Sequence, residues 1–326
     1  MQRRYLLRAA PLCLLPSLAV PTAIAQENYP SRAVTLIVAY VAGGSADQRM
    51  RQIGKFMASE FGQPFVVDNR PGAGGNIGTE IIARARPDGY TLGMGNLAPL
   101  SVNPSLYKRT NFDPQKELTM IALIERGPLM LVVKPDSGYR TVAELVTAAR
   151  TKPGGLSYGS SGAGSAHHLS GELFKSLTGA GMTHIPYKGG AAAVVDLMGG
   201  QLDFVFEPMY SALPSVRAGK LRALAITSEQ RSPIMAEVPT MEEAGIAGFH
   251  IENWQGLVGP AGLPAALVHR LNATVNKALT DPAIKAQMLG QGNEIGGGTP
   301  QDFAAFVKSE SARWAAVVAK NRIVIE

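Results

Sequence analysis

Short apolar runs alternate with longer amphipathic segments along most of the chain. Residues 34–40 form a continuous apolar run that is typical of a buried strand. Residues 47–61 follow the helical repeat instead, with an apolar face made of Met50, Ile53, Met57 and Phe61. Further strands are predicted at residues 65–67, 90–94, 120–124, 130–133 and 204–206. This alternation predicts an α/β fold whose mostly parallel sheets are flanked by helices.

Local signals mark where several predicted helices begin. Three segments have the spacing of a capping box, in which a threonine and a later carboxylate bond reciprocally to backbone N–H groups. They lie at Thr141 and Glu144, at Thr240 and Glu243, and at Thr299 and Asp302. A further predicted helix carries on one face the apolar residues Leu169, Leu173, Phe174 and Leu177.

Residues 1–25 read as a secretory signal peptide, cleaved before Gln26. A basic start with Arg3 and Arg4 precedes an apolar stretch at residues 6–24, which ends in Ala-Ile-Ala. Three prolines interrupt that stretch, which speaks against a transmembrane anchor. The paired arginines suit both the twin-arginine and the Sec export route, and both stay open.

The position of the single cysteine and the net charge limit the classes of protein to which the chain can belong. The single cysteine, Cys13, lies inside the predicted signal, so the mature chain offers no disulfide or thiolate site. An exported chain of this kind suggests the periplasm of a Gram-negative bacterium. The formal net charge is +6, and removal of the three arginines of the signal leaves +6 − 3 = +3. No basic stripe occurs, so nucleic acid is not an expected partner, whereas a mild positive surplus favours anionic solutes.

Glycines crowd the turn that follows the strand at residues 65–67. They are Gly72, Gly74, Gly75 and Gly78, and the helix after them carries Ile77, Ile81 and Ile82. Such a turn lets the backbone approach a neighbour closely. The spacing matches neither the dinucleotide-binding pattern nor the P-loop, so no nucleotide cofactor is expected.

Two other loops lead from a strand into a helix. Residues 41–47 (Val-Ala-Gly-Gly-Ser-Ala-Asp) precede the first long helix, where Asp47 can act as the cap. Residues 158–169 contain Ser160, Ser161 and Ser165 and lead into the predicted helix that carries Leu173 and Phe174 on its apolar face. Helix starts at the carboxyl ends of strands offer unpaired N–H groups to an anion. The alternative for residues 41–47 is a plain turn between a strand and a helix, capped by Asp47.

Histidines and serines in the second loop also suggest other chemistry. His167 and His168 point about 100° apart on a helix, which makes them a poor pair of metal ligands, so no metal site is expected. Ser165 and His168 could form a hydrolytic pair, but the surrounding residues lack the G-x-S-x-G pattern. Hydrolysis therefore stays an alternative to binding.

The sequence of residues 64–92 resembles a signature of the Bug (TctC-like) extracytoplasmic solute-binding proteins of tripartite tricarboxylate transporters. Further matches run from Tyr29 to the C-terminus, among them residues 186–189, 216–224 and 259–262. The resemblance implies a two-lobed periplasmic binding protein of type II-like fold, with the ligand in the cleft between the lobes. It places lobe 1 at residues 26–126 plus 248–326 and lobe 2 at residues 127–247, with crossings near 125–128 and 245–248.

The resemblance also implies a set of ligand-binding residues. Gly44, Ser45, Ala46 and Asp47 fall in a loop that contacts a bound carboxylate in the family, and Asn96 matches a pocket segment. Glu207 stands where the family often has aspartate, and could accept from a ligand or donate to a carboxylate as a neutral acid. The remaining candidates are Tyr40, Ser161, Gly162, Gly164, Ser165 and His168. Tyr40 and His167 depart from the family pattern, and Trp254 suits either core packing or the pocket wall.

The function that follows is a periplasmic receptor that captures a small carboxylate and delivers it to a tripartite membrane transporter. We expect a monomer that is not an enzyme and that uses no cofactor. A sensory protein that presents the same ligand to a sensor kinase is an alternative that the sequence does not separate from this one.

Overall fold

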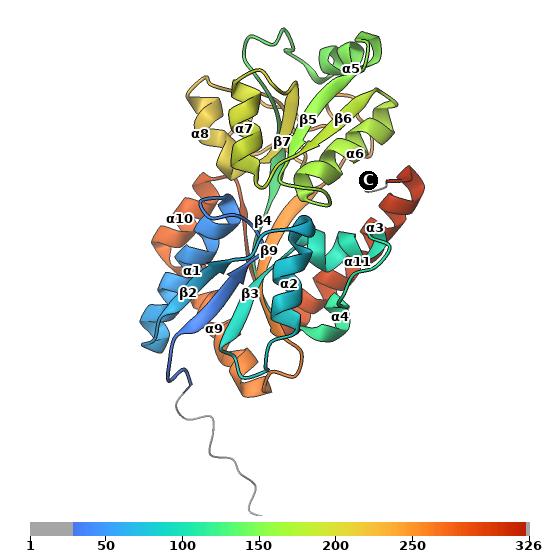
Figure 1. The fold of residues 1–326 in the computed structure, drawn as a ribbon. Helices are drawn as coiled ribbons and strands as arrows, with labels where there is room; N and C mark the ends of the chain where they lie inside the picture. Colours follow the sequence, from blue (N-terminus) through green and yellow to red (C-terminus); the bar gives the residue numbers. More distant parts are fainter. Residues whose placement is uncertain (1–28, 324–326) are drawn as a thin grey trace, which may run out of the picture.

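The computed structural model describes residues 29–323 as two groups of strands and helices, one above the other (Figure 1). The predicted signal peptide, residues 1–25, lies outside the described residues. Within residues 29–323, none of the helices has both the length and the apolar character that crossing a bilayer requires.

The lower sheet in Figure 1 is built around β1 and β4. Its strands are β1 (Val34–Val38), β2 (Phe65–Asn69), β3 (Thr91–Asn96), β4 (Leu118–Val133), β9 (Glu252–Pro260) and β10 (Glu294–Gly297). The strands β2, β1 and β3 run parallel, whereas β9 lies antiparallel between β3 and β4. This mixed order brings a strand from late in the chain into the middle of the sheet.

The upper sheet uses the second half of β4. Its other strands are β5 (Leu156–Ser160), β6 (Met182–Pro186), β7 (Phe204–Pro208) and β8 (Arg222–Ile226). The strands β5, β6 and β7 are parallel, and β7 and β8 pair antiparallel with β4 at residues 129–133. The strand β4 therefore passes without a break through both sheets, as Figure 1 shows.

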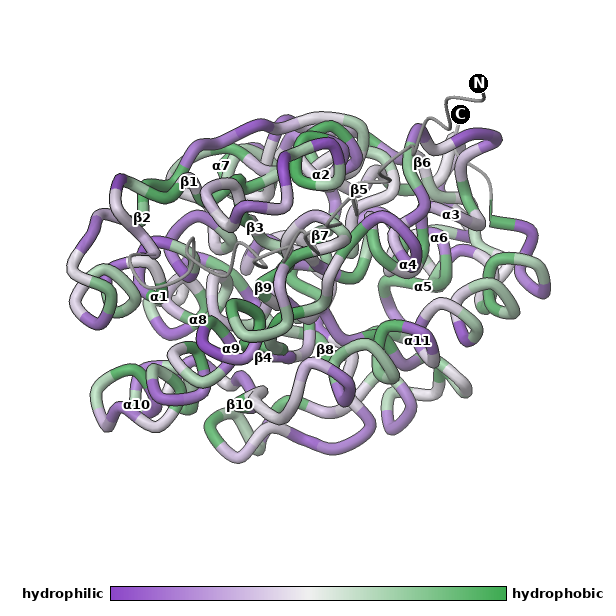
Figure 2. Tube along the Cα trace, turned by 90° about the horizontal axis from the view of Figure 1, so that it is seen from below, coloured by the Kyte–Doolittle hydropathy of each residue, from purple (hydrophilic) through white to green (hydrophobic). Residues whose placement is uncertain are grey.

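Helices cover both sheets. The lower group carries α1 (Ser45–Phe61), α2 (Asn76–Ala83), α3 (Asn103–Leu106), α4 (Pro114–Glu117), α9 (Ala265–Thr280), α10 (Pro282–Gly290) and α11 (Pro300–Asn321). The upper group carries α5 (Val142–Thr151), α6 (Ala166–Thr178), α7 (Gly190–Met198) and α8 (Met209–Arg217). Figure 2 shows hydrophobic and hydrophilic stretches alternating along the helices, as amphipathic elements over a core require.

The cores follow the apolar faces seen in the sequence. Met50, Ile53 and Met57 of α1 are fully buried against the lower sheet, in a cluster with residues of β1, β9 and α9. In the upper group, Phe174 packs edge to face with Phe204 and Phe206 of β7. Apolar burial at these positions holds each sheet to its helices. The predicted α/β fold with two lobes is confirmed.

Several local predictions need correction. The helix expected from Asp47 starts at Ser45, and the segment at residues 125–128 is the middle of a strand rather than a linker before one. The capping box of Thr240 and Glu243 forms both of its hydrogen bonds, but it closes a turn instead of a helix. That turn ends at Gly245, whose positive φ of 92° ends a helical path.

Apolar residues on two predicted helices are less buried than their periodicity suggests. Leu177 is 37% exposed at the end of α6, while its predicted partners on that face are buried. In α2, Ile82 is fully buried, but Ile77 is 49% exposed and Ile81 is 39% exposed. A short helix such as α2 buries only the side chains that face the sheet and leaves apolar residues beside that face partly exposed. The proposed lobe boundaries themselves stay a prediction.

Candidate functional site

A cavity of about 410 Å³ lies between the two groups of elements. The lower group supplies residues 40–46, Gln48, Met94, Asn96, Asn253, Gln255 and Gln291 to its wall. The upper group supplies Ser161, residues 165–167, residues 189–191, Val194, Glu207, Pro208, Tyr210, Ser211 and Pro214. The cavity therefore draws on both loops that the sequence singled out, which are more than a hundred residues apart.

The start of α1 forms one wall. Gly44 is the residue that precedes the helix, and no side chain caps the first turn. The backbone N–H groups at Ser45 and Ala46 therefore have no side-chain partner, and they carry the positive end of the helix dipole. Gly43, with a φ of 79°, turns the chain into this position.

Asp47 supports this loop from behind and does not line the cavity. Its carboxylate accepts hydrogen bonds from Gly43 N (2.9 Å), Arg51 Nε (2.9 Å) and Asn69 Nδ2 (3.0 Å). Burial would raise the pKa of Asp47, but the hydrogen bonds from Arg51, Gly43 and Asn69 outweigh it and lower that pKa. Asp47 thus holds the loop in shape as an ionised group within the first turn, and it is not the helix cap that we predicted.

The start of α6 forms the facing wall. Ser165 is the residue before the helix, and its hydroxyl accepts from His168 N at 3.4 Å. Gly164 N donates to His168 Nδ1 at 3.0 Å, and Gly162 N donates to Ser160 Oγ at 3.0 Å. Gly162, Gly164 and His168 therefore shape the loop from behind, whereas Ser161 and Ser165 line the cavity.

His168 is a buried part of the upper core. Its ring lies 4.0 Å, centroid to centroid, from that of His184, and burial lowers the pKa of His168 to about 4. Because His168 Nδ1 bonds to the loop backbone, that nitrogen does not contact the Ser165 hydroxyl. The structure thus provides no Ser165–His168 arrangement of the kind that activates a nucleophile.

The upper wall contains a chain of hydrogen-bonded polar side chains that the sequence analysis did not predict. His167 Nε2 lies 3.0 Å from Glu207 Oε2, and His167 Nδ1 lies 3.0 Å from Ser161 Oγ. Ser211 Oγ donates to the other oxygen of Glu207. Glu207 was a candidate, but nothing in the sequence paired it with His167, because the two are 40 positions apart. His167 therefore has a defined role in positioning Glu207.

Amide side chains form the floor of the cavity. The strand register places Asn96 of β3 beside Gln255 of β9, and Asn253 follows on the same face. Asn96 Nδ2 donates to Tyr40 Oη at 2.8 Å, and Gln255 Nε2 donates to Tyr210 Oη at 2.8 Å. In the sequence, the signal for this floor is the pair of amides Asn253 and Gln255, which alternate with Trp254 at the start of β9.

A buried arginine, Arg49, lies behind the cavity wall and is paired with the carboxylate of Glu125. Arg49 of α1 is 4% exposed and Glu125 of β4 is 2% exposed, and their charged atoms lie 2.9 Å apart. Arg49 Nη2 also donates to Gln291 Oε1 at 2.7 Å, and Gln291 lines the cavity. No lysine or arginine lies among the lining residues. An anion in the cavity would thus rely on N–H and hydroxyl groups.

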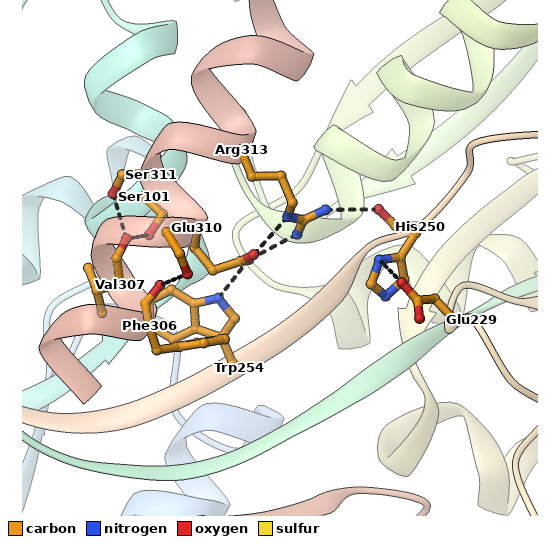
Figure 3. A network of polar contacts seen from close by, with 10 residues as sticks. Ser101, Glu229, His250, Trp254, Phe306, Val307, Glu310, Ser311 and Arg313 are labelled. Carbon is orange, nitrogen blue, oxygen red and sulfur yellow. Dashed lines mark hydrogen bonds and ion pairs between the residues drawn. The ribbon is translucent and has the colours of Figure 1, made fainter. Parts of the chain in front are cut away.

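Trp254 belongs to the core rather than to the pocket. Figure 3 shows its indole against α11, where Nε1 donates to Glu310 Oε2 at 3.2 Å. Its ring meets Phe303 and Phe306 edge to face. Figure 3 also shows Arg313 between Glu310 and the backbone oxygen of His250, which ties α11 to the segment before β9. Of the two roles considered for Trp254, core packing is the one found.

Comparison with known proteins extends these observations. Residues 49–323 match the family model described as the tripartite tricarboxylate transporter family receptor, TctC. The chain is 36% identical to Protein BugT of Bordetella pertussis, with 90% of this chain and 91% of BugT covered.

Within residues 29–323, no three His, Cys, Asp or Glu side chains converge as a metal site would require.

Solved structures share the fold of this chain. R. palustris Rpa4515 with adipate is 36% identical, with a TM-score of 0.87, and 91% of this chain and 99% of that chain are covered. MatC (Rpa3494) from Rhodopseudomonas palustris with bound malate is 31% identical, with a TM-score of 0.86 and coverage of 89% and 100%. These matches confirm the resemblance stated from the sequence.

Proposed function

The chain belongs to the tripartite tricarboxylate transporter receptor family, and from this premise we propose that it is a periplasmic solute-binding receptor for a small carboxylate. The observation that carries the proposal is the cavity that joins the starts of α1 and α6 from opposite sides. Relatives with bound adipate and malate support a carboxylate as the ligand class.

Helix starts of this kind hold anions without side-chain cations. One such contact contributes about 0.3–1 kcal/mol when exposed and up to about 2 kcal/mol when partly buried. Micromolar binding corresponds to about −8 kcal/mol, so several N–H groups and hydroxyls must act together in a site that excludes water. The size of the cavity limits the ligand to a small molecule.

We further propose that the receptor works as a monomer, delivers its ligand to membrane subunits of a tripartite transporter, and does not transform it. Ser165 and His168 lack the contact that a hydrolase needs. Purified protein should leave carboxylate esters unhydrolysed. Turnover that is lost in Ser165→Ala would contradict the binding-only role.

The loop before α1 provides a direct test of the binding site. Gly44→Leu places a side chain where the ligand should meet the helix start, and we expect carboxylate affinity to fall about tenfold or more, about 1.4 kcal/mol. The measurement is calorimetric titration with carboxylates first identified by thermal shift, in which a ligand at a hundred times its Kd adds about 2.7 kcal/mol.

Gly199→Leu is the matched control for this substitution. Gly199 has a φ of −74° against −72° for Gly44, and each has its nearest atoms at 3.3–3.5 Å from an added Cβ. Gly199 lies at the end of α7, away from the cavity wall. Equal loss of affinity in both variants, or none in Gly44→Leu, would show that the loop is only a turn.

A further inference from the structure

The cavity wall has one carboxylate and no cationic side chain to balance it. Glu207 is 4% exposed and is the only acidic residue among the lining residues, which include no lysine or arginine. The starts of α1 and α6 can accommodate one carboxylate of a ligand. A second carboxylate on the same ligand would face Glu207 with no lysine or arginine in the wall to offset the repulsion, and such like-charge contacts are costly in a water-poor site.

Glu207 is held in place by hydrogen-bonding groups at both of its carboxylate oxygens. His167 Nε2 lies 3.0 Å from one of its oxygens, and Ser211 donates to the other. An added Cβ at Gly190 would lie 2.7 Å from both Glu207 Oε2 and His167 Nε2, so the start of α7 sits directly over this pair. The positive end of α7 stabilises a carboxylate at that position.

His167 holds Glu207 without itself offering a donor to the ligand. One ring nitrogen faces Glu207 and the other lies 3.0 Å from Ser161 Oγ. Both nitrogens are therefore engaged within the wall, whatever the protonation state of the ring. A ligand carboxylate would gain no direct hydrogen bond from this imidazole.

The floor beside Glu207 is rich in acceptors. Asn96 Oδ1, Asn253 Oδ1 and Gln255 Oε1 are buried and have no hydrogen-bond partner among the described residues. Gln255 Nε2 donates to Tyr210 Oη at 2.8 Å, and the pKa of Tyr210 is raised first by burial and also by the charges of Glu125 and Glu207. Buried acceptors of this kind require donors, which a bound molecule can supply.

We propose that Glu207 and this amide floor form a subsite for a protonated amine, so that the preferred ligand is a short aminocarboxylate rather than a dicarboxylate. The inference rests on the proposed function and specifies its ligand class. The carboxylate of the ligand binds at the helix starts. Its ammonium group donates to Glu207 and to the free amide oxygens, which complements both the charge and the hydrogen-bonding pattern of the wall.

Calorimetric titration with matched ligand pairs tests this inference. Glutarate is compared with 4-aminobutanoate, and adipate with 5-aminopentanoate, because each pair differs only in a terminal carboxylate or ammonium group. We expect the wild type to bind the aminocarboxylate of a pair about tenfold more tightly. Glu207→Gln should lose about tenfold for the aminocarboxylate and so remove the preference. Glu237→Gln, which removes an exposed carboxylate from the same lobe, should keep it.

The outcomes separate the two proposals. Tighter binding of the dicarboxylates by the wild type, or an unchanged preference in Glu207→Gln, overturns the amine subsite and leaves the carboxylate receptor intact. If no member of either pair and no other carboxylate binds, the proposed function fails and the subsite fails with it. The wild-type comparison decides the question even if the variant does not fold.

Discussion

Two histidines of the upper group, the buried His168 and the half-buried His184, make the stability of the protein depend on pH. Burial lowers the pKa of His168 to about 4, and burial together with the neighbouring His168 lowers that of His184 to about 3, against an ordinary value of 6.5. The unfolded chain therefore binds more protons than the folded chain between these values. Stability that is present above about pH 6.5 should be lost as the pH falls towards 3–4.

The variant His184→Gln should make this pH dependence shallower, because one of the two titrating rings is removed. Urea unfolding at pH 7, 5.5 and 4 measures the effect. His269→Gln, at an exposed position on α9, serves as the control and should keep the wild-type slope. A wild type whose stability does not change over this range would refute the assignment of neutral buried rings.

Tyr210 makes a direct contact between the two sides of the cavity. It lies in the upper group, yet its hydroxyl accepts from Gln255 Nε2 of β9 at 2.8 Å. Tyr210→Phe leaves Gln255 Nε2 buried without an acceptor, which costs about 1–3 kcal/mol, and we expect that cost to appear as weaker ligand binding.

Calorimetry on Tyr210→Phe and Tyr139→Phe separates this bridge from a general effect of losing a hydroxyl. Tyr139 is half-buried and does not line the cavity. We expect binding about tenfold weaker in Tyr210→Phe and unchanged in Tyr139→Phe. The same affinity in both variants would mean that the bridge does not contribute to closure.

At the scale of single elements, the cap of α11 is the most testable feature. Thr299 Oγ1 accepts from Asp302 N at 3.1 Å, and the Asp302 carboxylate accepts from Thr299 N at 2.8 Å. Thr299→Ala removes half of this capping box and should lower the free energy of unfolding by about 0.5–2 kcal/mol. Thr147→Ala, exposed within α5, should change it by less than about 0.5 kcal/mol in the same urea titration.

Elements were easier to predict than the wall of the site. The alternation of strands and helices, the buried face of α1 and two of the three capped helices follow from local spacing alone. The turn at Thr240 shows the limit, because its box of hydrogen bonds is the same as at a helix start. Whether a helix continues depends on what the next residues pack against, which a local pattern does not contain.

Some residues of the candidate site could likewise be predicted from the sequence, and others could not. Ser45, Asn96, Ser165 and Glu207 line the cavity because strand ends and helix starts converge there, a rule that sequence order can supply. The polar residues that accompany Glu207 in the cavity could not be predicted in this way. His167, Tyr210 and Gln255 reach the cavity through pairing between distant segments, and no pattern within one segment encodes such a meeting.

At the scale of the whole molecule, the two groups also touch through residues that do not line the cavity. Tyr107 Oη donates to Ala163 O at 3.1 Å, and α11 reaches α6, where Ser176 Oγ donates to Asn321 Oδ1 at 3.0 Å. Figure 1 shows the end of α11 beside the upper group. These contacts must form and break if ligand entry requires the lobes to separate.

Small-angle scattering tests that motion directly. Saturating carboxylate should lower the radius of gyration of the wild type, because the contacts around the cavity close over the ligand. Gly44→Leu should show no such change at the same concentration. An unchanged radius in the wild type, with binding established by calorimetry, would rule out lobe closure as the mechanism.

The position of β9 has a consequence for how the chain acquires its structure. This strand lies between β3 and β4, yet more than a hundred residues separate it from either in sequence. The lower sheet therefore has a gap at its centre until nearly the whole chain is available. Contacts of such long sequence separation slow folding. The upper sheet, built from one continuous stretch after β4 begins, can form first and leave completion of the lower sheet as the slow step of refolding.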